Sequence, residues 1–413
     1  MFYYLIGIKG CALTALANLL YSEGHIVSGC DIGEDFYTKD KLKQFRIDNI
    51  EEVSLKEEYF YIIGNAYINH NITNKIKSLN FQYLYFPDFI SKYFKYHKQL
   101  CIAGSHGKTT TTSMLSTIVG ECNSIIGDGS GSYSDNDILI IESCEYKNTF
   151  LKYNPYIALI LNIDYDHPDF FSSLDDYIDA FRLFINNSKI VIANGDDENV
   201  LKLDLDELIT YGMNDYNDYC FSVIEGKNKT LIMINNVRFV IPLVGLHYAY
   251  DFVGAYLCAK FIGVSDSDIK SRLKAYKLPS RRLEEKNIDE MIFVNDYAHH
   301  PTEINALHDT LRIKYSGYKL VCFFQPHTIS RSLALLDEFK EKLSLFDETY
   351  IMKTFTSVRE GYDKGKEEYI MDYWGFPKVE EFRVLNYNFS KKNVYIFVGA
   401  GDINKLFNKI VKI

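Results

Sequence analysis

Short apolar runs alternate with helical patterns along nearly the whole chain, and this alternation predicts parallel α/β sheets. An apolar run at 2–8 leads into a glycine turn, a helix is expected at 11–21, and a second strand at 25–31 ends on Asp31. The pattern restarts near residues 98 and 278. A chain of 413 residues has room for two or three domains. We therefore expect an α/β protein of three domains, at 1–97, 98–277 and 278–413.

Further strands are expected where later apolar runs occur, at 100–104, 138–143, 156–163, 189–195, 291–298, 318–326, 348–355 and 393–401. Residues 218–242 alternate in a way that predicts a small antiparallel patch.

The composition excludes several classes of protein. A hydrophobic fraction of 47% and a charged fraction of 24% are typical of a folded chain. The net charge of −10 argues against a sequence-independent nucleic-acid binder. The 8 cysteines are scattered without a C-x-x-C pair, which argues against a disulfide framework or a thiolate zinc site. Since neither a signal peptide nor an apolar run of about 20 residues is present, we expect a cytoplasmic protein without a membrane partner.

The segment 104–110, Gly-Ser-His-Gly-Lys-Thr-Thr, lies between an expected strand and an expected helix at 110–119. This context predicts a phosphate loop, because backbone N–H groups at a helix N-terminus face an anion. Lys108 would reach the β- and γ-phosphates of a nucleotide, and Thr109 would hold Mg²⁺. The spacing is the short G-x-x-G-K-T form, since position 102 is Ile102 rather than glycine. The central domain is therefore expected to be of the P-loop ATPase type.

Polar side chains follow two expected strands downstream of this loop: Glu142, Glu145, Asn162, Asp164, Asp166, His167 and Asp169. Because the carboxyl ends of parallel strands form one crevice, these side chains are expected to converge on the loop. Oxygen ligands such as Thr109 and Glu145 suit Mg²⁺. Some of the three aspartates are expected to be only a solvated turn.

Histidine placement gives a further indication. Six of the 10 histidines lie in turns after strands or at helix starts: His106, His167, His247, His299, His300 and His327. Their spread over the later part of the chain predicts a site assembled from two domains.

The motifs occur in the order found in the Mur ligases, and the chain resembles that family over nearly its whole length. The most specific blocks are DYAHHPTEI at 296–304 and FQPHTISRS at 324–332. The others are the glycine turn 7–10, SGCD at 28–31, GSHGKTTTT at 104–112, ESCEYKNTFL at 142–151, NIDYDHPDFF at 162–171, SRRLEE at 280–285 and VGAGDI at 398–403. The phosphate loop alone also fits folylpolyglutamate synthetases, but those lack the separate N-terminal domain.

The resemblance is strongest to the family members that join L-alanine to UDP-N-acetylmuramate in peptidoglycan precursor synthesis. It implies a ligase that uses ATP and two Mg²⁺ ions, and an acyl phosphate formed on the lactyl carboxylate. It implies that the first domain is Rossmann-like and binds the UDP part, that the central domain binds ATP, and that the last domain is Rossmann-like and binds the amino acid. A muropeptide ligase, which attaches a preformed tripeptide, shares most of this pattern. The chain is expected to be a monomer or homodimer.

The resemblance also assigns residues to roles. Lys108, Glu145, His167, His299 and Arg331 would act at the reacting groups, and Thr109, Glu145 and His167 would hold metal. ATP would meet Gly104, Ser105, His106, Gly107, Lys108, Thr109, Thr110, His247, Asp251, Arg282 and Asp296. The sugar nucleotide and the amino acid would meet Gly7, Lys9, Gly10, Ser28, Asp31, Asn162, Tyr297, His299, His327 and Arg331. Asn162 would support the metal at His167, Arg331 suits a carboxylate, and His300 is either structural or chemical.

Two alternatives stay open at this point. The turn with Gly7, Gly10 and Asp31 could belong to a dehydrogenase, but Ala12 stands where a third glycine is expected, and Lys9 suits a pyrophosphate. The family carries asparagine where this chain has Asp251, and an ionised carboxylate can only accept hydrogen bonds. Asp251 therefore predicts weakened or relaxed adenine recognition, and it motivates a second hypothesis, a non-catalytic nucleotide-binding relative. Thr328 replaces a frequent arginine, which leaves Arg331 as the main guanidinium for the amino acid.

Overall fold

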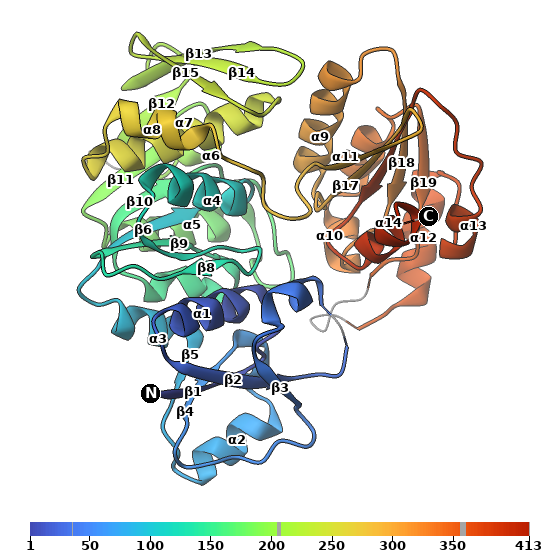
Figure 1. Cartoon of the computed structure of the whole chain (residues 1–413). Coiled ribbons are helices and arrows are strands. Elements are labelled where there is room, and N and C mark those ends of the chain that lie inside the picture. Colours follow the sequence, from blue (N-terminus) through green and yellow to red (C-terminus); the bar gives the residue numbers. More distant parts are fainter. Residues whose placement is uncertain (35, 205–207, 356–360, 413) are drawn as a thin grey trace. The chain divides into compact units, whose positions relative to one another are not determined.

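The computed structural model describes residues 1–34, 36–204, 208–355 and 361–412. The chain forms two compact units (Figure 1). The first unit comprises Met1–Asp164, Asp175–Phe221 and Tyr250–Tyr276. The second comprises Tyr165–Leu174, Ser222–Ala249 and Lys277–Ile413. The segment Tyr165–Leu174 thus belongs to the second unit, although the residues on either side of it belong to the first.

The N-terminal sheet of the first unit is wholly parallel, in the order β3-β2-β1-β4-β5. Its elements are β1 (Phe2–Ile6), α1 (Cys11–Ser22), β2 (Ile26–Asp31), η1 (Tyr37–Leu42), β3 (Arg46–Asn49), β4 (Phe60–Ile63), η2 (Asn65–Tyr67), α2 (Asn71–Ser78), β5 (Tyr83–Tyr85) and α3 (Phe86–Tyr93). Tyr4 and Ile6 of β1 pack in one core with Ile72 and Ile76 of α2. The turn after β1 requires glycine, because Gly7 has φ +88° and a Cβ there would lie 2.6 Å from the Tyr67 ring.

A second sheet of the first unit runs in the order β13-β12-β11-β10-β6-β9-β7-β8. Its pairs are parallel except for β7 with β8. The elements are β6 (Lys98–Ala103), α4 (Lys108–Val119), β7 (Asn123–Ile125), β8 (Gly131–Ser132), β9 (Ile138–Glu142), η3 (Tyr146–Lys152), β10 (Pro155–Ile160), α5 (Leu174–Ile185), β11 (Ile190–Asn194), α6 (Glu198–Leu201), β12 (Leu208–Gly212), β13 (Tyr219–Glu225), α7 (Leu246–Phe261) and α8 (Asp266–Leu273). The residues of β13 after Phe221 and those of α7 before Tyr250 are assigned to the second unit. Helix α4 starts at Lys108, two residues before the expected start, so Lys108 and Thr109 lie in its first turn.

The second unit contains a sheet in the order β16-β17-β20-β18-β19, parallel except for β16 with β17. Its elements are β14 (Thr230–Ile234), β15 (Val237–Ile241), β16 (Glu284–Ile288), β17 (Met291–Asp296), α9 (Pro301–Lys314), β18 (Lys319–Phe324), α10 (Ile329–Ala334), α11 (Leu336–Leu343), β19 (Glu348–Ile351), α12 (Lys364–Trp374), α13 (Glu381–Leu385), β20 (Asn393–Val398) and α14 (Ile403–Ile410). Strands β14 and β15 form an antiparallel hairpin, as expected for part of 218–242, whereas β13 pairs in parallel with β12.

Helices cover both faces of this last sheet (Figure 1). Val294 and Phe324 belong to one core, which α9, α11 and α12 complete. Their chain neighbours Phe293 and Phe323 belong to the opposite core, which α13 and α14 complete. This alternation follows from the period of two along a strand. The expected α/β class with mostly parallel sheets is confirmed, while the domain limits at 97 and 277 stay predictions.

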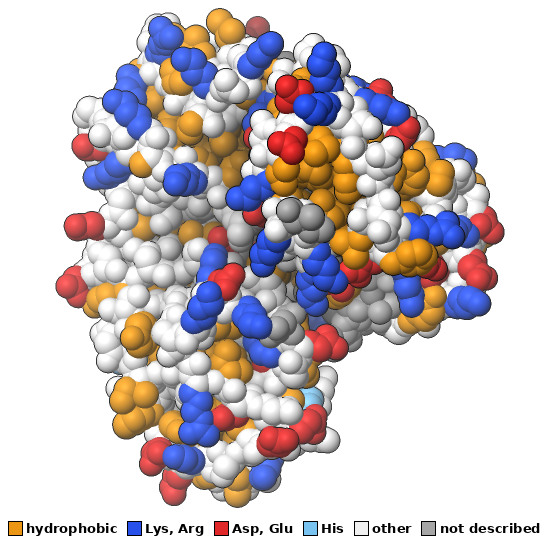
Figure 2. Space-filling model, turned by 45° about the vertical axis from the view of Figure 1, so that its right-hand side comes forward, with side chains coloured by type: hydrophobic (Ala, Val, Ile, Leu, Met, Phe, Trp, Pro, Cys, Tyr) orange, Lys and Arg blue, Asp and Glu red, His pale blue; other side chains and the backbone are white. Residues whose placement is uncertain are grey.

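The surface and the helices bear on possible partners. Among the described residues, no helix combines the length and the apolar character needed to cross a membrane. On the face that Figure 2 shows, lysine and arginine side chains are interspersed with aspartate and glutamate. The net charge of −10 is therefore not gathered into an acidic pole on this face.

Candidate functional site

The phosphate loop predicted from the sequence lies between β6 and α4 in the first unit. Gly107 has φ +82°, and a Cβ there would lie 2.4 Å from Oδ1 of Asp251, so only glycine fits. The loop is held by Asn162, whose Oδ1 accepts from the His106 backbone N–H (2.8 Å) and whose Nδ2 donates to the His106 carbonyl (3.1 Å). The side chain of Asn162 thus holds the loop backbone without help from a ligand. A substrate or metal contact for Asn162 stays a prediction.

Two further residues of the loop are fixed by the segment that follows β10. Ser105 Oγ donates to the Asp164 carbonyl (2.7 Å), and the His106 ring Nε2 lies 3.1 Å from Asp164 Oδ2. Thr110 is buried in the first turn of α4. The expected convergence of Asn162 and Asp164 on the loop is therefore observed.

Lys108 and Glu145 form an ion pair beside the loop, with Nζ 3.0 Å from Oε2. The pair forms because β6 and β9 are neighbours in the sheet, and Lys108 and Glu145 follow their carboxyl ends. Lys108 also donates to the carbonyls of Gly104 and Ser105, and Tyr177 donates to Glu145. Burial by itself would lower the pKa of Lys108, but the Glu145 carboxylate outweighs it and raises that pKa.

The donor set fits a magnesium nucleotide. Thr109 offers a hydroxyl oxygen and Glu145 a carboxylate oxygen, which are the hard ligands that Mg²⁺ prefers. The backbone N–H groups at the N-terminus of α4 suit the phosphates of the nucleotide. The residues present therefore fit both Mg²⁺ and the phosphates of a nucleotide.

In the second unit, Arg331 of α10 and Asp166 form a buried bidentate pair. Arg331 Nε donates to Asp166 Oδ1 (2.8 Å) and Nη2 donates to Oδ2 (3.1 Å). Each residue is 4% exposed. Burial by itself would raise the pKa of Asp166, but Arg331 and then His167, His300 and His299 hold it well below its usual value. The idea of a solvated turn is thus wrong for Asp166.

His167 follows Asp166 with a left-handed backbone, φ +57°. Such a conformation is costly for a residue with a Cβ and is often found at functional sites. The His167 ring Nε2 lies 3.8 Å from Asp166 Oδ2. Its segment belongs to the second unit, whereas Thr109 and Glu145 belong to the first. A metal contact for His167 stays a prediction.

Glu303, in the first turn of α9, holds two predicted site residues of the second unit. Its Oε2 accepts from the His299 backbone N–H (2.9 Å) and lies 3.1 Å from the ring Nδ1 of His299. Its Oε1 lies 3.6 Å from Nη1 of Arg282. Burial lowers the pKa of His299, while the Glu303 carboxylate acts in the opposite direction.

Tyr297 and His327 flank this group through ring contacts. The Arg282 guanidinium lies 5.2 Å from the Tyr297 ring centroid, and the Tyr297 and His299 rings are 5.2 Å apart. The His327 ring lies 5.9 Å from that of His299 and stacks on Phe355. These contacts place Arg282, Tyr297, His299 and His327 in one group of the second unit, which also contains Arg331. A contact of these residues with an amino acid or with ATP stays a prediction.

Asp296 and His300 serve the backbone. Asp296 is buried and accepts from the backbone N–H groups of Leu283 (2.7 Å) and Ala298 (2.8 Å). The ring of His300 accepts from the Thr302 N–H (3.3 Å) and caps α9. Of the two roles left open for His300, the structure shows the structural one. A ribose contact for Asp296 stays a prediction.

Two of the residues predicted to bind ATP, His247 and Asp251, fall on α7. His247 lies in the second unit, and burial, followed by the charge of Arg282, lowers its pKa to about 4. Asp251 lies in the first unit, is buried, and approaches Gly107 of the phosphate loop.

The N-terminal glycine turn is closed by its own polar side chains. Asp31 accepts from the Lys9 N–H (2.8 Å) and from the Tyr67 hydroxyl (2.5 Å). The Lys9 ammonium donates to the carbonyls of Ile32 and Glu34 (both 2.6 Å). Gly10 is the N-cap residue of α1, and Ser28 lies on β2 opposite Tyr4. Contacts of this turn with a UDP group stay predictions.

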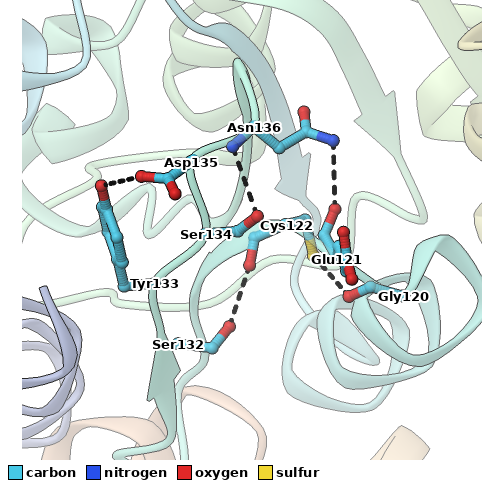
Figure 3. A pocket seen from close by; sticks show the side chains of 8 residues that line it. All are labelled: Gly120, Glu121, Cys122, Ser132, Tyr133, Ser134, Asp135 and Asn136. Carbon is cyan, nitrogen blue, oxygen red and sulfur yellow. Dashed lines mark hydrogen bonds between the residues drawn. The ribbon is translucent and has the colours of Figure 1, made fainter.

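A separate pocket of about 710 Å³ lies at the other end of α4 (Figure 3). Its lining residues are Gly120, Glu121, Cys122, Ser132, Tyr133, Ser134, Asp135 and Asn136. Several of their polar groups bond to one another: the Tyr133 hydroxyl donates to Asp135 (2.7 Å) and Asn136 Nδ2 to the Glu121 carbonyl (3.3 Å). The pocket shares no residue with the predicted site.

The sequence and the fold both resemble known proteins. Residues 130–259 match the model of the Mur ligase middle domain. The fold resembles UDP-N-acetylmuramate-alanine ligase MurC from Thermotoga maritima, with TM-score 0.82 and 21% identity over 100% of this chain and 98% of that one. The predicted resemblance to the Mur ligases is confirmed, and the likeness to MurC is one of fold.

Other solved structures share the fold. A murein peptide ligase from Psychrobacter arcticus has TM-score 0.73 and 17% identity over 100% of this chain and 98% of that one. A pseudomurein peptide ligase type C from Methanothermus fervidus has TM-score 0.64 and 17% identity over 99% of both chains. At these identities the likeness shows the fold alone. The amino acid or peptide that this chain uses as its acceptor substrate is therefore left to a proposal.

Sequence reasoning missed the roles of Asp166, Glu303 and Tyr177. Asp166 and Glu303 lie inside the motifs 162–171 and 296–304, next to residues that were singled out. A carboxylate beside a predicted histidine or arginine would have been the signal. Tyr177 lies on α5 outside the quoted motifs, and its sequence offers no such signal.

Proposed function

We propose that the chain is an ATP-dependent ligase that joins L-alanine to the lactyl carboxylate of UDP-N-acetylmuramate. The observation that carries the proposal is the pair of Lys108 and Glu145 beside a glycine loop, at the carboxyl ends of adjacent parallel strands. A positioned ammonium and hard oxygen donors at a helix N-terminus suit phosphoryl transfer, which depends on positioning and charge neutralisation.

The proposed reaction has two steps. In the first, a lactyl carboxylate oxygen attacks the γ-phosphorus of ATP, the bond to the β-phosphate oxygen breaks, and ADP leaves. In the second, the amine of L-alanine attacks the acyl carbon of the acyl phosphate, the carbon–oxygen bond breaks, and phosphate leaves. The amine loses a proton as the amide forms.

The chain's own residues supply binding and charge. Lys108 would neutralise the β- and γ-phosphates, and the N–H groups of the loop 104–107 and of the first turn of α4 would bind phosphate oxygens. Thr109 and Glu145 would hold Mg²⁺, and His167 is proposed for a second ion. Bound Mg²⁺ screens the repulsion between the carboxylate and the phosphates.

The second unit is proposed to bind the amino acid. Arg331 presents a planar guanidinium, which can grip a carboxylate in bidentate fashion. Tyr297, His299 and His327 lie in the same unit and would enclose the amino acid. The fold shared with MurC supports this acceptor, and the fold shared with the murein peptide ligase makes a peptide the main competitor.

Phosphate release from ATP tests the proposal. Release should require both UDP-N-acetylmuramate and L-alanine, and the product should be UDP-N-acetylmuramoyl-L-alanine by mass spectrometry. L-Alanyl-γ-D-glutamyl-meso-diaminopimelate, L-serine and glycine are the competing acceptors. Preference for the tripeptide would replace the proposal by a muropeptide ligase. Nucleotide binding without phosphate release from any acceptor would indicate a non-catalytic relative.

A further inference from the structure

The Asp166–Arg331 pair uses only part of the guanidinium. Asp166 takes hydrogen bonds from Nε and Nη2 of Arg331, which is one edge of the planar group. Nη1 is buried and has no hydrogen-bond partner among the described residues. A guanidinium carries five N–H donors and can serve two carboxylates on different edges. The edge that contains Nη1 is therefore left for a second acceptor.

The pair is too costly to be explained as packing alone. Both residues are 4% exposed, and taking two charges out of water offsets much of their attraction. Asp166 also precedes His167, whose backbone is left-handed, so the segment is held in a specific conformation. An ion pair of this kind is better suited to fix a geometry than to stabilise a fold.

We propose that Asp166 is a positioning residue: it holds one edge of the Arg331 guanidinium so that the Nη1 edge faces the carboxylate of the incoming amino acid. Asp166 itself does not touch the substrate. The pairing also fixes the guanidinium plane, because both carboxylate oxygens are engaged. This inference rests on the proposed function and deepens it, since it names the group that orients the amino-acid ligand.

Steady-state kinetics of Asp166→Asn test the inference. The amide keeps the size of the side chain, but it carries no charge and has only one oxygen. It therefore cannot accept hydrogen bonds from both Nε and Nη2 of Arg331. The KM for L-alanine should rise by about tenfold or more, as expected for a lost charge-assisted interaction. The KM values for ATP and UDP-N-acetylmuramate should stay within about twofold. Asp166→Glu keeps the carboxylate, so its KM for L-alanine should lie closer to the wild-type value than that of Asp166→Asn. This comparison keeps the inference testable even if Asp166→Asn folds poorly.

The coupling between the two residues provides the decisive readout. In an Arg331→Ala background, adding Asp166→Asn should change the KM for L-alanine by less than about twofold, because Asp166 acts through Arg331. The matched control is Glu285→Gln, which breaks the pair of Glu285 with Lys314 at the far end of α9 and should leave every KM unchanged. An equal rise in all three KM values, or an undiminished effect in the Arg331→Ala background, would overturn the inference.

The wild-type arm separates this inference from the function on which it rests. If the wild type releases phosphate with the tripeptide rather than with L-alanine, the same variants are measured with the tripeptide, which also carries carboxylates. A wild type inactive with every acceptor would overturn both. If the wild type is active and Asp166→Asn has the same KM for the amino-acid acceptor as the wild type, the inference is overturned while the proposed function stands.

Discussion

Lys108 Nζ lies 3.0 Å from Oε2 of Glu145, and this ion pair joins the first turn of α4 to the residue that precedes η3. Glu145 is 1% exposed, so its charge depends on Lys108 and on the hydroxyl of Tyr177. The Lys108 ammonium, which is proposed to bind the phosphates, is thus held beside the Glu145 carboxylate, which is proposed to hold Mg²⁺.

Replacing Lys108 by methionine should abolish most of the activity. The side chain keeps its length but loses the charge proposed for the phosphates, and phosphate release should fall by about 100-fold to 1,000-fold. The thermal midpoint should also fall, because Glu145 is left buried without its ammonium partner. The control is Lys43→Met, which removes an exposed pair with Asp40 and should change neither quantity. Full activity in Lys108→Met would contradict the assignment of the loop.

Gly107→Ala should weaken ATP binding and lower stability. The substitution places a Cβ 2.4 Å from Asp251 Oδ1, in addition to the cost of about 1–2 kcal/mol for an L-residue at a left-handed position. Gly263→Ala is the matched control, because Gly263 has φ +91° in the same unit but has nothing within 4 Å of the added Cβ. The thermal midpoint should fall further for Gly107→Ala than for Gly263→Ala, and only Gly107→Ala should raise the KM for ATP. Equal effects would show that the contact with Asp251 is unimportant.

The strands and the phosphate loop could be predicted because their signals are local. The apolar runs around 100–104 and 138–143 mark β6 and β9, and the glycine spacing around Lys108 fixes a strand–loop–helix unit. The rule that carboxyl ends of parallel strands meet then placed Glu145 near Lys108, as observed.

The partners of Arg331 and His299 could not be predicted from local patterns. Arg331 pairs with Asp166, which lies 165 positions away in the sequence, and nothing in either segment indicates the other. His300 was left open between a structural and a chemical role, and only the observed hydrogen bond from the Thr302 N–H to its ring assigns the structural one. Side chains that serve a buried backbone, such as Asp296, look the same in sequence as side chains that bind ligand.

Asp251→Asn should sharpen the choice of nucleotide. An ionised carboxylate cannot donate, whereas an amide both donates and accepts, as adenine recognition requires. Its approach to Gly107 also places a negative charge beside the phosphate loop. The KM for ATP should fall by a few fold, and the ratio of kcat/KM for ATP over GTP should rise. Asp215→Asn, at an exposed carboxylate of the same unit, is the control. Equal and strong ATP selectivity in the wild type and Asp251→Asn would contradict this prediction.

His247 should make the stability of the protein depend on pH. Burial, followed by the charge of Arg282, lowers its pKa from 6.5 to about 4, so the folded state keeps the ring neutral where the unfolded state protonates it. The contribution is therefore complete above pH 6.5 and is lost as the pH falls toward 4, with a total of at most about 3 kcal/mol. His247→Gln does not titrate, and its thermal midpoint should fall less between pH 7 and pH 4.5 than that of the wild type. Identical pH profiles would show that the pKa of His247 does not differ between the folded and unfolded states.

Glu303→Gln should impair the amino-acid side of the reaction through two neighbours at once. The change removes the negative charge that lies 3.1 Å from the His299 ring and 3.6 Å from Arg282 Nη1. Because Glu303 opposes the effect of burial, its loss should lower the pKa of His299 further, which NMR titration of the ring can follow. We expect kcat/KM for L-alanine to fall by about tenfold to 100-fold, with a smaller change in the KM for UDP-N-acetylmuramate. Glu341→Gln, at an exposed position of α11, is the matched control. If Glu303→Gln shifts neither the His299 titration nor the use of L-alanine, then Glu303 serves only to hold the start of α9.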